Sequence, residues 1–582
     1  SDVVVGSALG WYVGRQVVRA HREEESGDGA QYGQFIRDER ERSPLEMASP
    51  YVPLDSWVYD AFDRLAAMGH LRTAFAGLKP WTRMECARLA AEAGDQLGPD
   101  DDGGAVQARA LQHALADEFA PEVARLAGGD NFGAQVDSVY VRFTGISGTP
   151  LRDSYHFGQT IVNDYGRPYG EGFNSVTGFS SHAVAGPLAI YLSGEYQYSP
   201  GPKPYSDAVK NAIGAFHADD TFSPLGISQP GGPANRFETL DAYAVLNVRG
   251  YQLSFGKQSG WWSPDHSGSF LLSTNAEPMY MLRLNRTTPA RLPWIFSALG
   301  PMRTEFFLAR QSGVHRGNSE TGVIISPDAS FDPQPFIHGQ KISFKPTPNF
   351  EFSISRTTLM GGPKFPFTTR RFINSLFSTA NSFGPDDPGD RRSAVDFTWR
   401  VPKLRKWLVF YNDAFAEDEI SPIAYPRRSA MNPGIYMPQI PKLPKLDFRA
   451  EGVFTDLPAG LLAPGFSYKS ARYPDGYTNA GQLLGHWVGR QGSGMQFWST
   501  YWLAPRNKVQ IGYRQQWVDK DFLQGGSLQD FSARGEFMLR PDLGLTTNVQ
   551  YENWKFPLLA PGKQSNFSTS VQFTWFPKWG KK

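Results

Sequence analysis

Apolar and polar residues alternate along most of the chain from about residue 136 onward. In residues 350–355, FEFSIS, each apolar side chain is followed by a glutamate or serine, and residues 509–514 and 545–552 repeat this period of two. A period of two places the apolar side chains of a strand on one face. Several of these segments extend over about ten residues, the length that a tilted strand needs to cross a bilayer. The pattern predicts an all-β, antiparallel transmembrane barrel.

The connections between these strands support the same prediction. Residues 503–508 and 539–544 are short enough to be tight turns, whereas residues 207–233 and 365–390 are long and contain helix-like pieces. Barrels of the outer membrane have short turns at one end and long loops at the other. We expect the long inserts to be outer loops or plugs of the lumen. The last predicted strand, residues 566–575, is aromatic, similar to the signal by which such barrels are recognised for assembly.

The N-terminal part of the chain has a different pattern. Residues 1–48 begin apolar and become strongly charged, so we expect an arm that is partly disordered or binds a partner. Residues 49–127 have a helical period, with Val58 and Leu65 on one predicted face. The predicted organisation is therefore this arm, a small helical region, and a barrel over residues 128–582.

Composition narrows the class of protein. Aromatic residues make up 14% of the chain, yet mean hydropathy is −0.40, as expected for a barrel with an apolar lipid face and a polar lumen. The formal charge of +1 gives no indication of a nucleic-acid partner. The single cysteine, Cys86, cannot form an internal disulfide or a cysteine-ligated metal cluster. Val3–Val18 lacks a small-residue cleavage site, so we do not interpret it as a signal peptide.

Residues 51–93 resemble an S-layer-homology (SLH) module. Trp57 stands near the start of a predicted helix, Gly69 follows its end, and Thr82 and Glu85 form a Thr-Arg-x-Glu box that opens the next helix. The spacing of Thr82 and Glu85 also fits a capping box, in which each residue satisfies a backbone amide of the other.

The SLH resemblance implies contact with a cell-wall polymer. In such modules, arginine and tryptophan near the box contact the wall, which here implicates Arg83 and Trp57. A capping box is purely structural in most proteins that contain one, and this alternative stays open.

A second resemblance covers most of residues 130–582. GYQLSFGKQSGWWSPD (250–265), FYNDAFAEDE (410–419) and GQLLGHWVGRQGSGMQF (481–497) are similar to motifs of the Wzi family of capsule-assembly outer-membrane proteins. The resemblance implies a closed barrel of roughly 18 strands with periplasmic helices. It also implies a lectin that holds capsular polysaccharide at the cell surface.

Two groups of residues are candidates for glycan binding. Trp261 and Trp262 end a predicted strand, and an indole ring can pack on the apolar face of a sugar. The alternative for this pair is packing or membership of the aromatic girdle at the membrane boundary. Asp413, Glu417 and Asp418 could bond sugar hydroxyls or a cation, although acidic residues in a loop are usually just solvated.

Motifs for catalysis are missing from the sequence. The histidines have no metal-ligand spacing, the serines lack a GxSxG elbow, and no phosphate-cradling glycine pattern is present. Two carboxylates of a glycosidase would need a spacing of about 5–9 Å, which sequence cannot show. We therefore predict a non-enzymatic protein without a metal or cofactor.

Three functional hypotheses remain. The first is an outer-membrane barrel, with periplasmic helices, that binds surface or capsular polysaccharide and aids its assembly and retention. The second is a porin for small solutes, tethered to the wall by the SLH-like helices. The third is a structural anchor for an envelope complex through residues 1–48. The expected partners are polysaccharide, outer-membrane lipid, and peptidoglycan or another envelope protein at the N-terminal region.

Overall fold

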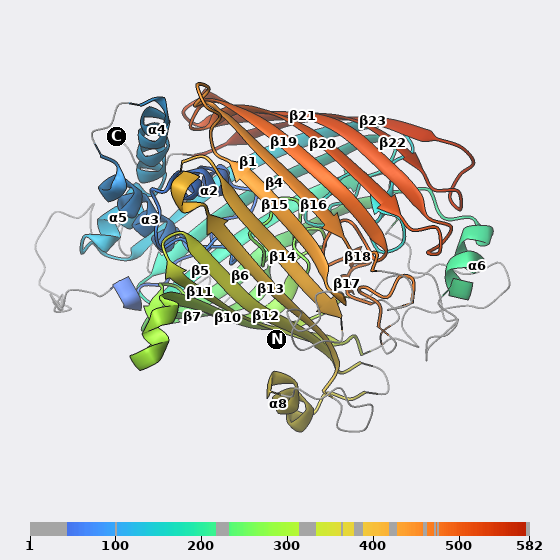
Figure 1. The fold of residues 1–582 in the computed structure, drawn as a ribbon, viewed down its shortest axis with the longest axis horizontal. Helices are drawn as coiled ribbons and strands as arrows, with labels where there is room; N and C mark the ends of the chain where they lie inside the picture. The colour runs from blue at the N-terminus through green and yellow to red at the C-terminus, as the bar shows by residue number, and fades with distance from the viewer. Residues whose placement is uncertain are drawn as a thin grey trace, which may run out of the picture. The chain divides into compact units, whose positions relative to one another are not determined.

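The protein is a closed antiparallel barrel with a group of helices at one end (Figure 1). The computed structural model describes residues 44–98, 102–216, 232–312, 333–362, 365–377, 388–404, 406–417, 428–457, 463–470, 473 and 476–577. Most of the predicted arm, residues 1–43, lies outside the described residues.

Eighteen strands form the barrel, as predicted, and the last strand pairs with the first. Val141 lies opposite Phe573 of the last strand on one side and opposite Thr177 on the other, which closes the sheet. The two-residue strand β9 (Ala290–Arg291) extends the sheet beside β10. The strands are β1 (Phe132–Gly148), β4 (Gly172–Ala185), β5 (Leu188–Ser199), β6 (Ala234–Val248), β7 (Tyr251–Gln258), β8 (Met279–Arg286), β10 (Pro301–Arg310), β11 (Phe336–Thr347), β12 (Phe350–Met360), β13 (Asp390–Arg400), β14 (Val409–Glu417), β15 (Ala430–Met437), β16 (Leu446–Phe454), β19 (Gly492–Ala504), β20 (Asn507–Val518), β21 (Gly526–Arg540), β22 (Leu543–Lys555) and β23 (Gln564–Trp575).

The wall of the barrel is apolar outside and polar inside. On β7, Tyr251, Leu253 and Phe255 are exposed on the outer surface, and Gln252 and Ser254 between them are buried. This arrangement reverses that of a water-soluble protein and follows from strands whose outer side faces lipid. Among the described helices, none is both long and apolar enough to span a bilayer.

The predicted helices are present, and they lie at the end of the barrel that has the short turns (Figure 1). They pack around a shared apolar core, in which Phe62 and Leu89 are fully buried. The segment before these helices forms hydrogen bonds with two turns of the barrel. The Ala48 amide donates to Gly186 O in the β4–β5 turn (2.9 Å), and Leu45 O accepts from the Gly250 amide in the β6–β7 turn (2.7 Å). The helices are α2 (Trp57–Met68), α3 (Arg83–Gln96), α4 (Gly103–Glu118) and α5 (Ala120–Leu126), preceded by η1 (Pro44–Glu46). Residues 44–127 are called the helical region below.

The long connections lie at the opposite end of the barrel (Figure 1). Two of them contain the helices that the sequence indicated, α6 (Asp207–Phe216) and α8 (Thr369–Phe377). Two inserts also contain short hairpins. These consist of β2 (Arg152–Asp153) with β3 (Gly158–Gln159), and of β17 (Thr478–Asn479) with β18 (Gln482–Leu483).

Candidate functional site

Three inserts between neighbouring strands fold back and fill the lumen of the barrel. They are residues 149–171 between β1 and β4, residues 259–278 between β7 and β8, and residues 455–491 between β16 and β19. Phe270 and Trp487 belong to the core that these inserts form with inward side chains of the wall. The described residues of the three inserts are called the plug. The lumen therefore contains a packed core, and this core is built by inserts other than residues 207–233 and 365–390, which the sequence had suggested as outer loops or plugs.

Hydrogen bonds join the three inserts to one another. The Ser273 amide donates to Leu484 O (3.0 Å), which links the second insert to the third. The Leu483 amide donates to Ser154 Oγ (3.0 Å), which links the third insert to the first. Backbone groups buried in a lumen need such partners, and here the inserts satisfy each other. The plug is one interconnected body.

Trp261 and Trp262 lie inside the barrel, at the junction of the plug and the helical region. Trp262 is 1% exposed, donates its indole N–H to Glu305 (2.9 Å), and packs on Phe307 with ring centroids 5.1 Å apart. Trp261 is half-buried and exchanges two backbone hydrogen bonds with Lys79 of the helical region (2.9 and 3.0 Å). Trp262 thus has the packing role that was the alternative to sugar stacking. A role of this pair in glycan binding stays a prediction.

The acidic candidates that the structure describes also lie in the lumen. Asp413 is 1% exposed and accepts from the Phe270 amide (3.2 Å). Glu417, at the end of β14, accepts from the Tyr468 amide (2.9 Å). Both carboxylates therefore hold plug inserts against the wall. Asp418 lies outside the described residues.

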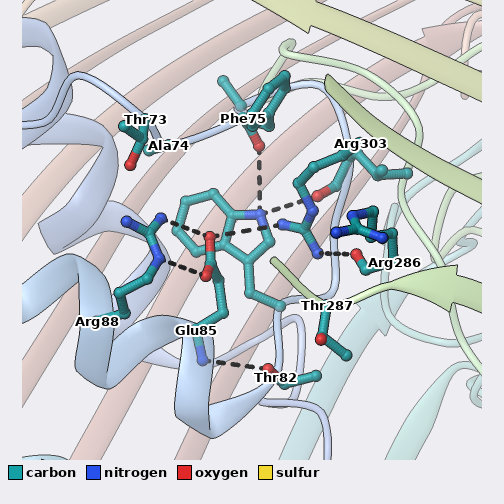
Figure 2. A network of polar contacts seen from close by, with 12 residues as sticks. Thr73, Ala74, Phe75, Thr82, Glu85, Arg88, Arg286, Thr287 and Arg303 are labelled. Carbon is teal, nitrogen blue, oxygen red and sulfur yellow. Dashed lines mark hydrogen bonds and ion pairs between the residues drawn. The ribbon is translucent and has the colours of Figure 1, made fainter. Parts of the chain in front are cut away.

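The predicted capping box is only half present. Thr82 accepts from the Glu85 amide (3.1 Å), as expected, but the Glu85 carboxylate turns away from the helix start. It pairs with Arg88 (2.8 Å) and lies 4.0 Å from Arg303 of β10, as Figure 2 shows. Glu85 and Arg303 side chains are each 1% exposed. The carboxylate that was expected to complete the cap instead joins the helical region to the barrel wall.

The two wall-binding candidates have partners within the chain. Arg83 pairs with Glu122 (2.9 Å) and lies over the ring of Phe119. Burial alone would lower the pKa of Arg83, but the Glu122 carboxylate holds it above its ordinary value. Trp57 is half-buried, with the Arg506 guanidinium 5.3 Å from its ring centroid. Binding of a wall polymer by these residues stays a prediction.

Further contacts between the helical region and the wall were not predicted from the sequence. The Glu351 carboxylate accepts from the amides of Ala76 and Gly77 (3.0 Å each), and Lys508 pairs with Asp60. Glu351 and Lys508 are each the second residue of a strand that follows a short turn. A charged residue at an inward position beside a short turn is a signal that could have identified this interface.

A pocket lies between the plug and the insert that carries α8, at the long-loop end. Phe365, Phe367 and Tyr473 contribute aromatic rings to its lining, together with Met360 and Arg371. Tyr473 belongs to the plug, and the other residues belong to β12 and to the insert that follows it. Aromatic rings beside a guanidinium can hold a ligand that has both an apolar face and polar groups. The sequence did not indicate this pocket, because Tyr473 is more than 80 residues from the rest of the lining.

The part of the chain that the structure describes contains no group of three or more histidine, cysteine, aspartate or glutamate residues that could hold a metal ion.

Comparison with solved structures agrees with the observed fold. Wzi from Escherichia coli, an outer membrane protein involved in group 1 capsule assembly and a carbohydrate-binding β-barrel, is similar with a TM-score of 0.63 and 15% identity, over 91% of this chain and 100% of that one. OccK7 (OpdD) from Pseudomonas aeruginosa matches with a TM-score of 0.37 and 10% identity, over 76% of this chain and 99% of that one. OccAB1 from Acinetobacter baumannii matches with a TM-score of 0.39 and 8% identity, over 76% of this chain and 96% of that one. No curated protein matches the sequence.

Comparison with family models gives the identity of the barrel. The model described as capsule assembly protein Wzi matches residues 142–569, from the first strand to the last. The SLH-like segment receives no support from either comparison. Since the match spans well over half of the chain and the barrel is of the outer-membrane type, this outer-membrane protein belongs to the Wzi family of capsule assembly proteins.

Proposed function

We propose that this protein binds a surface polysaccharide at the long-loop end of its barrel and aids assembly and retention of a capsule or exopolysaccharide, without catalysis. The observation that carries the proposal is the combination of a filled lumen with an aromatic and basic pocket at the long-loop end. Membership of the capsule-assembly family supports it. The Escherichia coli protein of the same fold is described as carbohydrate-binding, which adds support.

The orientation follows from the connections of the barrel. Outer-membrane barrels have short turns in the periplasm and long loops outside. On this rule the helical region is periplasmic, and the pocket between Met360 and Tyr473 faces the cell exterior. A polysaccharide at the cell surface would reach this pocket without crossing the membrane.

The pocket itself has room for only about one water molecule, so a sugar would pack on its exposed lining. Phe367 is 42% exposed, so part of its ring is open to a ligand. The C–H face of a pyranose ring packs on an aromatic ring as other apolar groups do. Arg371, also in the lining, offers N–H donors to hydroxyl or carboxylate oxygens.

A binding experiment tests the proposal. Phe367→Ala should lower the affinity for capsular or exopolysaccharide by about tenfold, since one aromatic contact contributes about 1 kcal/mol beyond its buried area. Phe377→Ala is the matched control, because Phe377 ends α8 of the same insert, is 78% exposed, and does not line the pocket. Equal affinities of both variants and the unchanged protein would contradict the proposed site. Absence of binding to any surface polysaccharide would contradict the proposed function.

The hypothesis of a wall-tethered porin receives less support, and the structural anchor stays a prediction, because residues 1–43 lie outside the described residues. A diffusion porin needs an open lumen, whereas the plug fills this one. The residues implicated in wall binding, Trp57 and Arg83, are engaged by Arg506 and Glu122. We therefore do not extend the proposal to solute transport or to the cell wall.

A further inference from the structure

Three consecutive large apolar residues are exposed in the connection that leads from β8 and β9 to β10. Trp294, Ile295 and Phe296 are 88%, 81% and 55% exposed, and they begin the short helix η2 (Trp294–Leu299). Residues 293–298 are called the tip. A contiguous apolar surface of this kind indicates an interaction site. These side chains lie beyond the strands and are not part of the barrel wall itself.

The backbone holds the tip in place. Arg291 of β9 pairs with Pro301 of β10 at its base. Gly300 has φ 75°, and a Cβ there would lie 2.0 Å from Lys345 O, so the chain runs close against β11. Trp294 has φ 61°, which is uncommon and unfavourable for a residue with a side chain. The loop that exposes the three side chains is therefore fixed to β10 and β11 by its backbone.

The tip continues the lipid-facing surface of the barrel. Tyr280, Leu282 and Leu284 form the outward face of β8 and are 59%, 39% and 40% exposed. The tip follows β8 at the short-turn end, and the yellow-green helix marks it in Figure 1 at the end that carries α2–α5. Tryptophan and other aromatic residues concentrate where the hydrocarbon of a bilayer meets its headgroups. The position and the composition of the tip match this zone.

A cationic side chain accompanies the apolar ones. Arg291 is exposed, and it forms no ion pair with any residue that the structure describes. A guanidinium beside an apolar insertion is suited to a lipid phosphate. We propose that the tip inserts into the phospholipid leaflet at the short-turn end, with Arg291 on headgroup phosphates, and so fixes the depth of this side of the barrel. This inference requires a membrane-spanning barrel but not polysaccharide binding.

A fluorescent label tests the insertion. The only cysteine of the sequence, Cys86, is fully buried, so a cysteine placed at position 295 can be labelled selectively. We would label Ile295→Cys with a polarity-sensitive dye and reconstitute the full chain into vesicles of phosphatidylethanolamine and phosphatidylglycerol. Val106→Cys is the control, since Val106 is 48% exposed on α4 of the same end.

The expected result is blue-shifted emission at position 295, quenched by lipids that carry a nitroxide near the headgroup. Position 106 should keep the emission of a dye in water. Emission typical of water at position 295 would overturn the proposal. Blue-shifted emission that lipid nitroxides do not quench would also overturn it, because it would indicate a protein contact such as a second copy.

A second variant tests the role of the cation. Arg291→Gln in the labelled protein should weaken the quenching in vesicles that contain phosphatidylglycerol and have less effect in vesicles of phosphatidylcholine alone. Equal quenching of both proteins in both kinds of vesicle would contradict a phosphate contact at Arg291. These vesicle experiments do not depend on glycan binding at the pocket. The membrane proposal and the polysaccharide proposal can therefore be contradicted independently.

Discussion

The plug and the helical region both close the barrel, but different interactions hold them. The plug is built from strand connections, and its inserts share an apolar core with the wall and hydrogen bonds with one another. The helical region has an apolar core of its own. It meets the wall through charged groups, such as Glu85 with Arg303 and Asp60 with Lys508, and through smaller apolar clusters. The plug is thus part of the barrel interior, whereas the helical region is a module docked on it. Substitutions and pH should affect the two regions differently.

The largest expected effect comes from removing part of the plug. Replacement of residues 151–169 by a short Gly-Ser linker keeps the paired strands β1 and β4 and removes one of the three inserts. The remaining inserts lose partners such as Ser154, which binds the Leu483 amide. We expect ion conductance across planar bilayers to appear in this variant. A variant that stays as closed as the intact protein would show that this insert does not seal the lumen.

The next effect concerns the docking of the helical region. Arg303→Ala removes a buried partner of Glu85, and breaking a buried ion pair costs about 3–5 kcal/mol. Because Arg88 still pairs with Glu85, we expect about 3 kcal/mol, the lower end of this range. The measurement is the rate of thiol labelling at buried Cys86, which should increase as the region opens.

The matched control for Arg303→Ala is a surface ion pair. Arg540 pairs with Asp542 at a short turn, and its side chain is 64% exposed. Exposed pairs contribute about 0–1 kcal/mol, so Arg540→Ala should leave Cys86 labelling unchanged. Similar labelling rates for both variants would contradict a docking role for Arg303.

A smaller effect is expected within the plug. Tyr468→Phe removes a hydroxyl that donates to Phe270 O and accepts from the His486 amide, both at 3.1 Å. Leaving these buried groups unsatisfied should lower the free energy of unfolding by about 2 kcal/mol. Tyr196→Phe is the control, because its hydroxyl bonds an exposed Asn235. Urea unfolding followed by tryptophan fluorescence measures both variants, and equal midpoints would contradict the prediction.

The smallest effect is a dependence on pH at the contact between the helical region and the wall, where Lys508 pairs with Asp60 and with Glu536 of β21. Burial alone would raise the pKa of Asp60, but Lys508 holds it below its ordinary value of 3.8. A lowered carboxyl pKa stabilises the folded state above the ordinary pKa, and this stabilisation is lost as pH falls through the folded value. Lys508→Met should lower the urea midpoint at neutral pH, and the difference should narrow below about pH 4.

The control for Lys508→Met is Lys406→Met. Lys406 pairs with Asp102, and their side chains are 44% and 53% exposed, so the same change of residue type should have little effect at any pH. A difference between Lys508→Met and the unchanged protein that persists undiminished at low pH would show that neither carboxylate paired with Lys508, Asp60 or Glu536, is responsible.

Much of the fold could be predicted from local pattern. The period of two identified strands such as β12 and β22, and turn lengths separated the two ends of the barrel, because alternation and turn length are local properties. The C-terminal end of α2 could also be predicted from Gly69, because a glycine that ends a helix can adopt the left-handed conformation, here with φ 98°.

Contacts within the lumen could not be predicted in the same way. Trp262 and Asp413 were singled out as candidates for glycan binding, which stays a prediction. Their packing in the lumen could not be read from the sequence, because it depends on contacts with distant inserts. Glu85 fits a capping box by spacing alone, yet its carboxylate pairs with Arg88 and lies near a buried arginine more than 200 residues away, a contact that spacing could not indicate. The pocket beside Tyr473 likewise combines residues separated by more than 80 positions.

Single-channel recording of the intact protein in planar bilayers tests the central claim most directly. If the plug seals the lumen and the barrel binds glycan at its long-loop end, the intact chain should show no large, steady open current. A large and steady current through the unaltered protein would contradict the closed lumen, and with it the proposal that this barrel holds polysaccharide at its outer end instead of conducting solutes.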